Sequence, residues 1–375
     1  MKEQVNYSPG LDGIIAAETK LSFLDTVQSE IVIRGHDLID LSETVGYLEI
    51  VNLLLQGRLP DAEEKTGLER ALKNEYEIPG EILKILKLLP EKTHPMDALR
   101  TGISALAGYD TNIDDRSASV NLERAYKLLG KVPAIVANSY RVLNKQEVVL
   151  PNKDLSYSAN FYCMITGKVP SAVEEKIFDQ SLLLYSEHEM PNSTFTARVI
   201  ASTLSDLYGA LTGAVASLKG SLHGGANEAV MYMLLEAGTV DKFERLLEGK
   251  LANKEKIMGF GHRVYMKKMD PRALIMKQAL KQLCDAKGDD RLYKMCEAGE
   301  VIMEREKGLY PNLDYYAAPV YYMLGLPISI YTPIFFSART VGLCAHVIEQ
   351  HASNRLFRPR VNYIGERHNR NVISN

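Results

Sequence analysis

From about residue 42 onward, hydrophobic positions in the chain recur at intervals of three and four. This spacing places apolar side chains on one face of an α-helix. Clear examples are VGYLEIVNLLLQGRLP, GEILKILKLLP, NLERAYKLLGKVPAIVANSYRVL, AVEEKIFDQSLLLYSEH and SDLYGALTGAVASLKGSL. Asp61 and Ser171 are suited to cap two of these helices, and Gly57 and Gly167 are suited to end two others. The pattern predicts a mainly α protein.

Two smaller features modify this picture. Before residue 42, short alternating runs such as SEIVIRG indicate a small N-terminal β element. Later, Gly209 and Gly213 lie four positions apart and leave one helical face almost bare. Another helix can approach such a face closely, either across a subunit interface or within the core.

Length and composition exclude several classes of protein. With 375 residues and 46% hydrophobic side chains, the chain can bury a large core, and two domains are expected. A net charge of -3 offers no basic excess for nucleic acid. The four cysteines are widely separated, and MKEQVNYSPGLDG lacks the apolar core of a signal peptide, so a cytoplasmic location is expected.

Residues 315–338 carry no charge and are long enough to span a membrane. However, Pro319, Pro327 and Pro333 interrupt the stretch. Because proline breaks helices, the composition favours a buried helix with its connections over a membrane helix.

Candidate chemistry lies in polar segments between the apolar helices. In IMGFGHRVYMKKMDPRA, His262 follows Gly-Phe-Gly and is itself followed by four cationic residues, which suits a small anionic ligand. Other such segments are SEHEMPNSTFTAR with His188, SLHGGANEAV with His223, GLYPNLDYYAAPVYYMLG with Asp314, FFSARTVGLCAHVIEQH with Arg339, and NRLFRPRVNYIG with Arg358 and Arg360. Taken singly, each is compatible with a structural role, such as a hydrogen-bonded histidine or a helix cap.

Familiar site motifs are missing from the sequence. There is no His-x-x-x-His pair or Cys/His array of the kind that binds a metal. Gly259-Phe260-Gly261 lacks the third glycine and the preceding strand of a dinucleotide site, and no Gly-x-Ser-x-Gly elbow occurs. We therefore predict no metal, no dinucleotide and no serine-hydrolase chemistry.

In their order along the chain, the polar segments resemble the citrate synthase family over essentially the whole sequence. The resemblance is carried by IRGHDLIDL, HPMDALRTGISALAGYD, NSTFTARVIAST, LHGGANE, GFGHRVYMKKMDPRA, YPNLDYYAA and RPRVNYIG. The short bacterial 2-methylcitrate synthases look most similar. The resemblance implies a homodimer in which residues 1–224 and 326–375 form a large, dimer-forming helical domain. Residues 225–325 would form a small domain that closes over the active-site cleft.

The resemblance also implies the reaction. Propionyl-CoA or acetyl-CoA would condense with oxaloacetate and water to give 2-methylcitrate or citrate plus CoA. Asp314 would act as the base, His223 would donate a hydrogen bond to the thioester oxygen, and His262 would face the ketone. A dedicated citrate synthase is the first alternative. The second is a non-catalytic paralogue that binds CoA or oxaloacetate, although the presence of all three catalytic residues weighs against it.

Binding residues follow from the same resemblance, and no metal or redox cofactor is implied because CoA enters as part of a substrate. Oxaloacetate would be bound by His188, Arg272, Arg339 and Arg358, the last contributed by a neighbouring subunit. The CoA adenine would lie against the backbone of Ile257, Met258, Gly259, Phe260 and Gly261, and Lys267 and Lys268 would either meet the CoA phosphates or remain solvated. Arg272 follows His262 by ten positions, one more than is usual in the family, which alters the path of the loop that carries both lysines.

Overall fold

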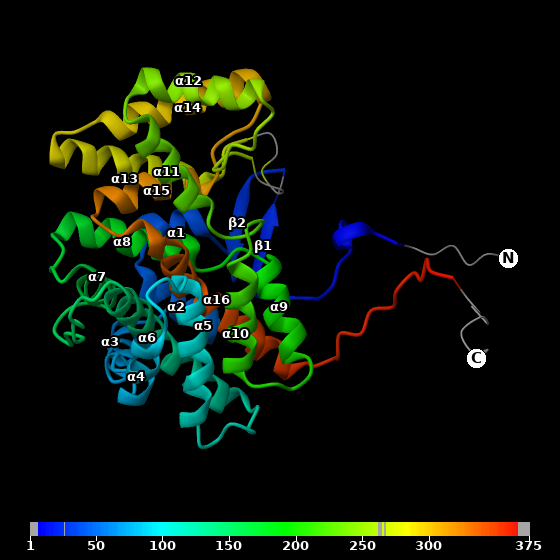
Figure 1. The fold of residues 1–375 in the computed structure, drawn as a ribbon. Coiled ribbons are helices and arrows are strands. Elements are labelled where there is room, and N and C mark those ends of the chain that lie inside the picture. The colour runs from blue at the N-terminus through cyan, green and yellow to red at the C-terminus, as the bar shows by residue number, and fades with distance from the viewer. Residues whose placement is uncertain (1–6, 26, 262–264, 266–267, 367–375) are drawn as a thin grey trace, which may run out of the picture.

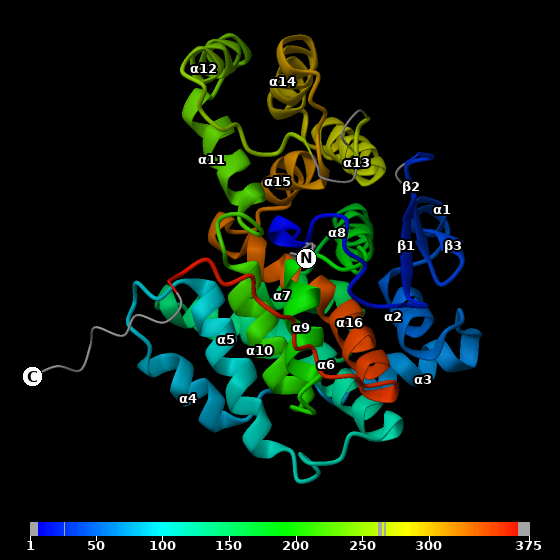
Figure 2. The same cartoon turned by 90° about the vertical axis from the view of Figure 1, so that its right-hand side faces the viewer.

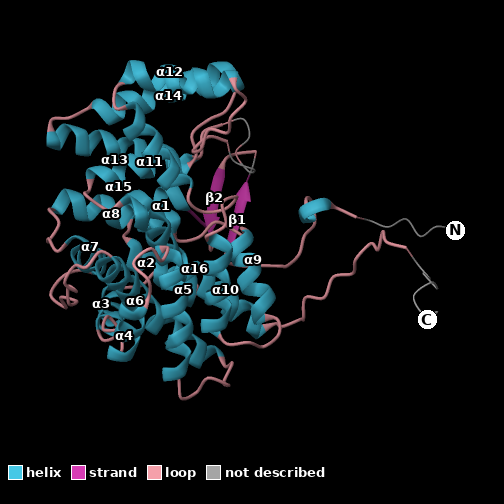
Figure 3. Ribbon diagram, in the orientation of Figure 1, coloured by secondary structure: helices cyan, strands magenta, loops and turns pink. Residues whose placement is uncertain are grey.

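The computed structural model describes residues 7–25, 27–261, 265 and 268–366. Helices dominate it, and a small antiparallel sheet near the N-terminus has the strand order β1-β2-β3 (Figure 3). The strands are β1 (Ser22–Asp25), β2 (Glu30–Ile33) and β3 (His36–Asp37). Ser22 pairs with Ile33, and Asp25 pairs with Glu30. The prediction of a mainly α chain with a minor β element is confirmed.

The helices form two groups in space. In Figure 1, α11 to α15 pack together at one end of the molecule, and the other helices make up the larger body. The helices are α1 (Leu38–Thr44), α2 (Tyr47–Gln56), α3 (Ala62–Lys73), α4 (Gly80–Leu88), α5 (Pro95–Leu106), α6 (Ala118–Leu143), α7 (Tyr157–Thr166), α8 (Ala172–Tyr185), α9 (Asn192–Ala201), α10 (Leu207–Leu218), α11 (Ala226–Ala237), α12 (Val240–Ala252), α13 (Pro271–Lys287), α14 (Arg291–Lys307), α15 (Leu313–Met323) and α16 (Tyr331–Ala352). Short 3-10 helices are η1 (Pro9–Leu11), η2 (Ala107–Tyr109) and η3 (Ile328–Ile330). The predicted domain boundaries near residues 225 and 325 stay a prediction.

The helix ends agree with the sequence signals. Asp61 and Ser171 each form a capping box, in which the cap side chain accepts from the third residue of the helix and that residue's carboxylate accepts from the cap backbone. Gly57 and Gly167 end α2 and α7 in the left-handed conformation, with φ of 82° and 75°. Local chemistry therefore sets these boundaries.

The bare glycine face of α10 packs inside the chain at Gly213. A Cβ added there would lie 2.1 Å from the side chain of Ile200 on α9, so α9 and α10 approach closely at this position. Gly213 therefore has a neighbour within its own chain. A subunit interface on the glycine face stays a prediction.

Helix α16 runs through the core of the larger body and contacts α2, α6, α8, α9 and α10. Among the described residues, the segment Ile328–Ala352 is long and apolar enough to cross a membrane, but 89% of its most apolar window is buried inside the protein. A helix that is apolar on all sides is expected at the centre of a large core. A polar residue that is buried in this helix is therefore a candidate for a specific structural or functional role.

Both terminal segments leave the body on the same side (Figures 1 and 2). After α16, residues 353–366 form no helix or strand, and all but Phe357 are exposed. Phe357 anchors the start of this segment, because its ring contacts that of Phe195 and its N–H donates to Ser202. Beyond this anchor the segment extends away from its own chain.

Candidate active site

A cavity of 1190 Å³ is lined by residues of α11–α15 and their connections on one side and by residues of the larger body on the other. Its walls come from the N-terminal segment, the loops that follow α8 and α10, the segment before α13, the start of α15, and α16. Most of the residues predicted to form a site line it: His188, His223, Ile257, Met258, Phe260, Gly261, Arg272, Asp314 and Arg339. The fold therefore gathers these segments from positions more than 150 residues apart.

Among the described residues, Gly259, Lys268 and Arg358 do not line the cavity. Arg358 is exposed on the C-terminal segment, and Lys268 is exposed and donates a hydrogen bond to the carbonyl of Val27. His262 and Lys267 lie outside the described residues. In this chain alone, the cavity thus lacks Arg358.

Gly259 underlies the cavity wall. Its φ is 88°, and an added Cβ would lie 2.7 Å from Val230 and 2.9 Å from Tyr315. This close approach lets the 257–261 segment pair with the segment before α15, where Asn312 N–H donates to the Gly259 carbonyl at 2.9 Å. Two segments that the sequence analysis treated separately are therefore neighbours.

Asp314 lies in the first turn of α15, next to its cap, Asn312. The Tyr185 hydroxyl lies 2.6 Å from Asp314 Oδ1. Burial raises the pKa of Asp314, although the Tyr185 hydrogen bond and the nearby guanidinium of Arg272 oppose this effect. Asp314 is thus a carboxylate whose basicity is increased by its surroundings.

The tautomer of His223 follows from its contacts with Ser193. The backbone N–H of Ser193 donates to His223 Nε2 at 3.2 Å, so Nε2 is an acceptor and the proton of the neutral ring is on Nδ1. Burial, with a contribution from the positive charge of Arg339, lowers the pKa of His223 to about 4. The imidazole is therefore a neutral donor through Nδ1 at ordinary pH.

Two buried arginines face the cavity. Arg272 makes a bidentate pair with Asp270, at 3.0 Å from Nε and 2.8 Å from Nη2. Arg339 has no carboxylate within ion-pairing distance among the described residues; its Nε donates to the Tyr185 carbonyl, and its guanidinium lies 4.9 Å from the centre of the Phe335 ring. Burial lowers the pKa of Arg339 to about 10, so it remains cationic at neutral pH.

This arrangement suits a small anion with carboxylate groups. A guanidinium offers a planar fork that matches a carboxylate, and burial strengthens the interaction. His188 lines the same cavity, with its Nε2 3.2 Å from the Tyr265 hydroxyl. The cavity thus combines a carboxylate base, a neutral hydrogen-bond donor and a site for an anion.

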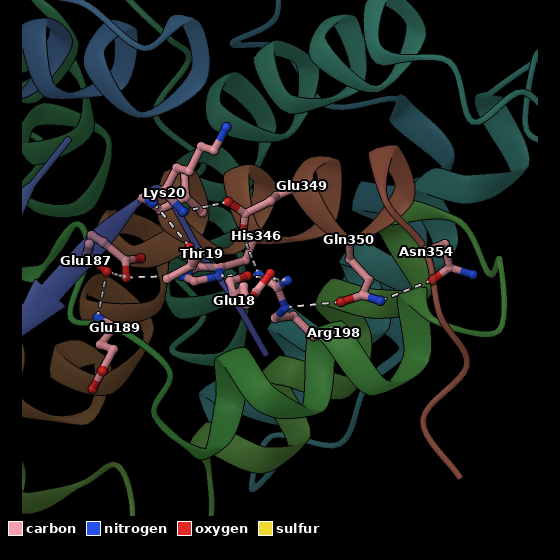
Figure 4. Close-up of polar contacts among 12 residues, drawn as sticks. Glu18, Thr19, Lys20, Glu187, Glu189, Arg198, His346, Glu349, Gln350 and Asn354 are labelled. Atoms are coloured by element: carbon pink, nitrogen blue, oxygen red, sulfur yellow. Dashed lines mark hydrogen bonds and ion pairs between the residues drawn. The ribbon is translucent and has the colours of Figure 1, made fainter. Parts of the chain in front are cut away.

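A second polar cluster consists of Arg198, His346, Glu187, Glu349 and Gln350, none of which lines the cavity (Figure 4). Arg198 donates to His346 Nδ1 at 2.9 Å, and because arginine cannot accept, this nitrogen carries no proton. His346 therefore donates from Nε2 to Glu187 at 3.1 Å. Arg198 also pairs with Glu349 at 2.7 Å and donates to Gln350 at 3.1 Å.

Sequence reasoning missed three residues that shape the cavity: Tyr185, Ser193 and Asp270. Asp270 had a detectable signal, because an aspartate two positions before an arginine and just before a proline is suited to cap a helix. Tyr185 had none, since its partner is 129 positions away. Among the described residues, no group of three or more His, Cys, Asp or Glu side chains could hold a metal.

Comparison with known proteins agrees with this geometry. A family model for the citrate synthase C-terminal domain matches residues 10–360. The chain is 72% identical to the citrate/2-methylcitrate synthase of Bacillus subtilis, over 98% of this chain and 99% of that protein. It is 70% identical to the citrate synthase of Heyndrickxia coagulans, over 96% of this chain and 97% of that protein.

A solved structure also superposes closely. The ternary complex of carboxymethyl coenzyme A and oxaloacetate with citrate synthase from Thermoplasma acidophilum has a TM-score of 0.92 and 31% identity, and the match covers 98% of each chain. Fold and cavity define a mainly helical protein with a buried site for a small anion. This chain belongs to the citrate synthase family.

Proposed function

We propose that this chain condenses propionyl-CoA and acetyl-CoA with oxaloacetate and water, giving 2-methylcitrate and citrate plus CoA. The chain is an acyl-CoA:oxaloacetate condensing enzyme, as its family membership and its 72% identity to a citrate/2-methylcitrate synthase support. The observation that carries the proposal is that one cavity holds Asp314, His223 and the buried arginines Arg272 and Arg339.

In the first step, Asp314 takes a proton from the acyl carbon next to the thioester carbonyl. An aspartate has an ordinary pKa of about 3.9 and is a weak base for such a bond, so the enolate oxygen must be stabilised as it forms. The Nδ1–H of His223 supplies the donor. One such donor contributes roughly 3 to 4 kcal/mol to the transition state.

In the second step, the enolate carbon attacks the ketone carbon of oxaloacetate. His262, which by family resemblance faces the ketone, would protonate the new alkoxide. Water then hydrolyses the thioester and releases CoA. Holding both substrates in register removes much of the entropic barrier to forming the carbon–carbon bond.

Oxaloacetate is a dianion, and we place its carboxylates against Arg272, Arg339 and His188. Arg358 would come from a second copy of the chain, since in its own chain it lies outside the cavity. Exposed apolar side chains on both terminal segments support a homodimer, among them Ile15 at 89% exposed and Ile364 at 92%. The 257–261 backbone would bind the adenine of CoA, and Lys267 and Lys268 would be available to its phosphates.

The shared site has a direct test. A chain with Arg358→Ala and a chain with Asp314→Asn should each be inactive alone, and mixing them should restore part of the activity in hybrid dimers. Subunit exchange is first verified by mass spectrometry of the mixed species. If verified hybrids show no recovery, the cavity is complete within one chain.

The reaction is tested by the release of free thiol from acetyl-CoA and propionyl-CoA in the presence of oxaloacetate. We expect both to be used, because a pocket distinguishes one methylene by only about 1 to 3 kcal/mol. Comparing kcat/KM at saturating oxaloacetate ranks them, and we expect propionyl-CoA to be the physiological substrate. Turnover of acetyl-CoA alone would indicate a dedicated citrate synthase, and no turnover with intact binding would indicate a non-catalytic paralogue.

A further inference from the structure

The last residue of α8, Tyr185, connects both halves of the cavity. Its side chain is only 2% exposed, and its hydroxyl lies 2.6 Å from Asp314 Oδ1. Its backbone carbonyl accepts a hydrogen bond from Arg339 Nε. One residue thus contacts the proposed base through its side chain and the proposed oxaloacetate arginine through its backbone.

The direction of the tyrosine–aspartate hydrogen bond is defined. Burial, together with the adjacent carboxylate of Asp314, raises the pKa of Tyr185 well above its ordinary value. Tyr185 therefore stays protonated over the pH range of the enzyme and donates to the carboxylate. A hydrogen bond to an ionised acceptor is shorter and stronger than one between neutral groups.

The carboxylate of Asp314 has few other constraints. Among the described residues, the Tyr185 hydroxyl is its only hydrogen-bond donor, because the polar contact with Asn312 involves the backbone N–H of Asp314 instead. One oxygen, Oδ1, is therefore held by tyrosine. Within the described part of the chain, no hydrogen-bond donor reaches the other oxygen, Oδ2.

Tyr185 is itself held firmly. Its ring centroid lies 4.6 Å from that of Phe335 and 6.5 Å from that of Tyr321, so its hydroxyl has a fixed direction. A side chain locked by packing can orient a catalytic group more accurately than a mobile one can. The aromatic wall thus provides the rigidity that a base requires.

We propose that Tyr185 is a positioning residue that fixes Asp314 through Oδ1, so that Oδ2 is the oxygen that removes the proton from the acyl carbon. This inference rests on the proposed function and adds a residue to it. The hydrogen bond lowers the basicity of Asp314 somewhat, and in exchange it aligns the carboxylate with the carbon. Its loss should therefore slow proton removal and at the same time raise the pKa of the base.

Tyr185→Phe removes only the hydroxyl and leaves the backbone bond to Arg339 in place. The matched control is Tyr162→Phe, since Tyr162 is also buried and donates to the Leu324 carbonyl at 2.7 Å, but does not line the cavity. For both variants and the parent, kcat and KM are measured against pH, together with Tm.

For Tyr185→Phe we expect kcat to fall roughly tenfold to a hundredfold, the range that misplacing a catalytic group produces. The KM for oxaloacetate should stay within about twofold of the parent value, since the anion contacts are untouched. The acid limb of the kcat profile should move to higher pH. Tyr162→Phe should change Tm without moving that limb.

A folded Tyr185→Phe protein with parental kcat and a parental acid limb would overturn the inference. An equal loss in both variants that followed Tm would do the same, because it would assign Tyr185 to packing alone. If the parent turns over no acyl-CoA, the proposed function fails first. Carbon-13 NMR of aspartate-labelled protein then still measures the pKa of Asp314, with Asp314→Asn assigning the signal, and an unchanged pKa in Tyr185→Phe rejects the hydrogen bond itself.

Discussion

Two buried arginines, one on α16 and one packed against it, have different surroundings. Arg198, on the neighbouring α9, donates hydrogen bonds to Glu349, His346 and Gln350 of α16. Arg339, on α16 itself, donates from Nε to the Tyr185 carbonyl and lines the cavity. Both residues are less than 5% exposed.

This difference indicates that the charge of Arg198 has a structural role and that the charge of Arg339 has a role in binding. Burying a charge is costly unless partners compensate it, and the partners of Arg198 lie within the protein. Arg339 has more distant compensation from the carboxylates of Glu187 and Asp314, neither of which pairs with it directly. The pKa of Glu187 is held below its ordinary value by His346 and Arg339 in spite of burial. A buried cation left partly unpaired beside a cavity is expected to receive its remaining partner from a ligand.

The largest effect in the cavity should come from Asp314→Asn. Because the amide cannot remove a proton, kcat should fall by about a thousandfold, within the range typical of general bases. Oxaloacetate binding should be nearly unchanged, since the arginines that hold it are separate. Steady-state rates and isothermal titration measure the two quantities, and turnover close to that of the parent would exclude Asp314 as the base.

In the second cluster, Arg198→Gln should act on stability. Glu349 is partly buried and keeps the hydrogen bond from the Lys20 N–H, so the loss is that of a charged hydrogen bond, and we expect the free energy of unfolding to fall by about 1.5 to 3 kcal/mol. Denaturant titration measures this. The protein that remains folded should keep the parental KM for oxaloacetate, and a selective rise in that KM would place Arg198 in the binding site instead.

For Arg339→Gln the expected pattern is reversed. Losing charged hydrogen bonds to a carboxylate costs about 1.5 to 3 kcal/mol, so the KM for oxaloacetate should rise roughly tenfold to a hundredfold. The Tm of the free enzyme should not fall, because no buried carboxylate loses a direct partner. A variant that unfolds easily but binds oxaloacetate normally would remove the distinction between the two arginines.

The sequence predicted the parts of this comparison that depend on local pattern. Helix periodicity, the caps at Asp61 and Ser171, and the polar segments around His188, His223 and Asp314 are all readable within a few residues. The mainly α fold follows from these signals. Arg339 was also predicted, but only because its segment resembles a segment of the citrate synthase family.

Other features depend on how distant segments meet. Tyr185 reaches Asp314 only because α8 and α15 come together, and no local pattern announces that meeting. The close approach of Gly213 to Ile200 of α9 could not be derived from the glycine spacing, since it depends on how the two helices pack. The contacts of Arg358 could likewise not be derived from local sequence pattern, because its proposed site lies on another copy of the chain.

The smallest expected effect concerns the stability of the free enzyme. Burial raises the pKa of Asp314, so the folded state disfavours the ionised form relative to the unfolded state. Stability is therefore lost as pH rises through this raised pKa, and Asp314→Asn should relieve the loss. The Tm gain should be largest at neutral pH and should vanish as pH falls toward the ordinary aspartate value of about 3.9.

The exposed Asp154→Asn serves as the control in thermal unfolding across this range. A gain that grew toward acid pH would mean that the arginines lower the pKa of Asp314 by more than burial raises it. The cavity would then hold a carboxylate that is stabilised in its charged form. Its surroundings would resemble the paired surroundings of Arg198 more than those of a base.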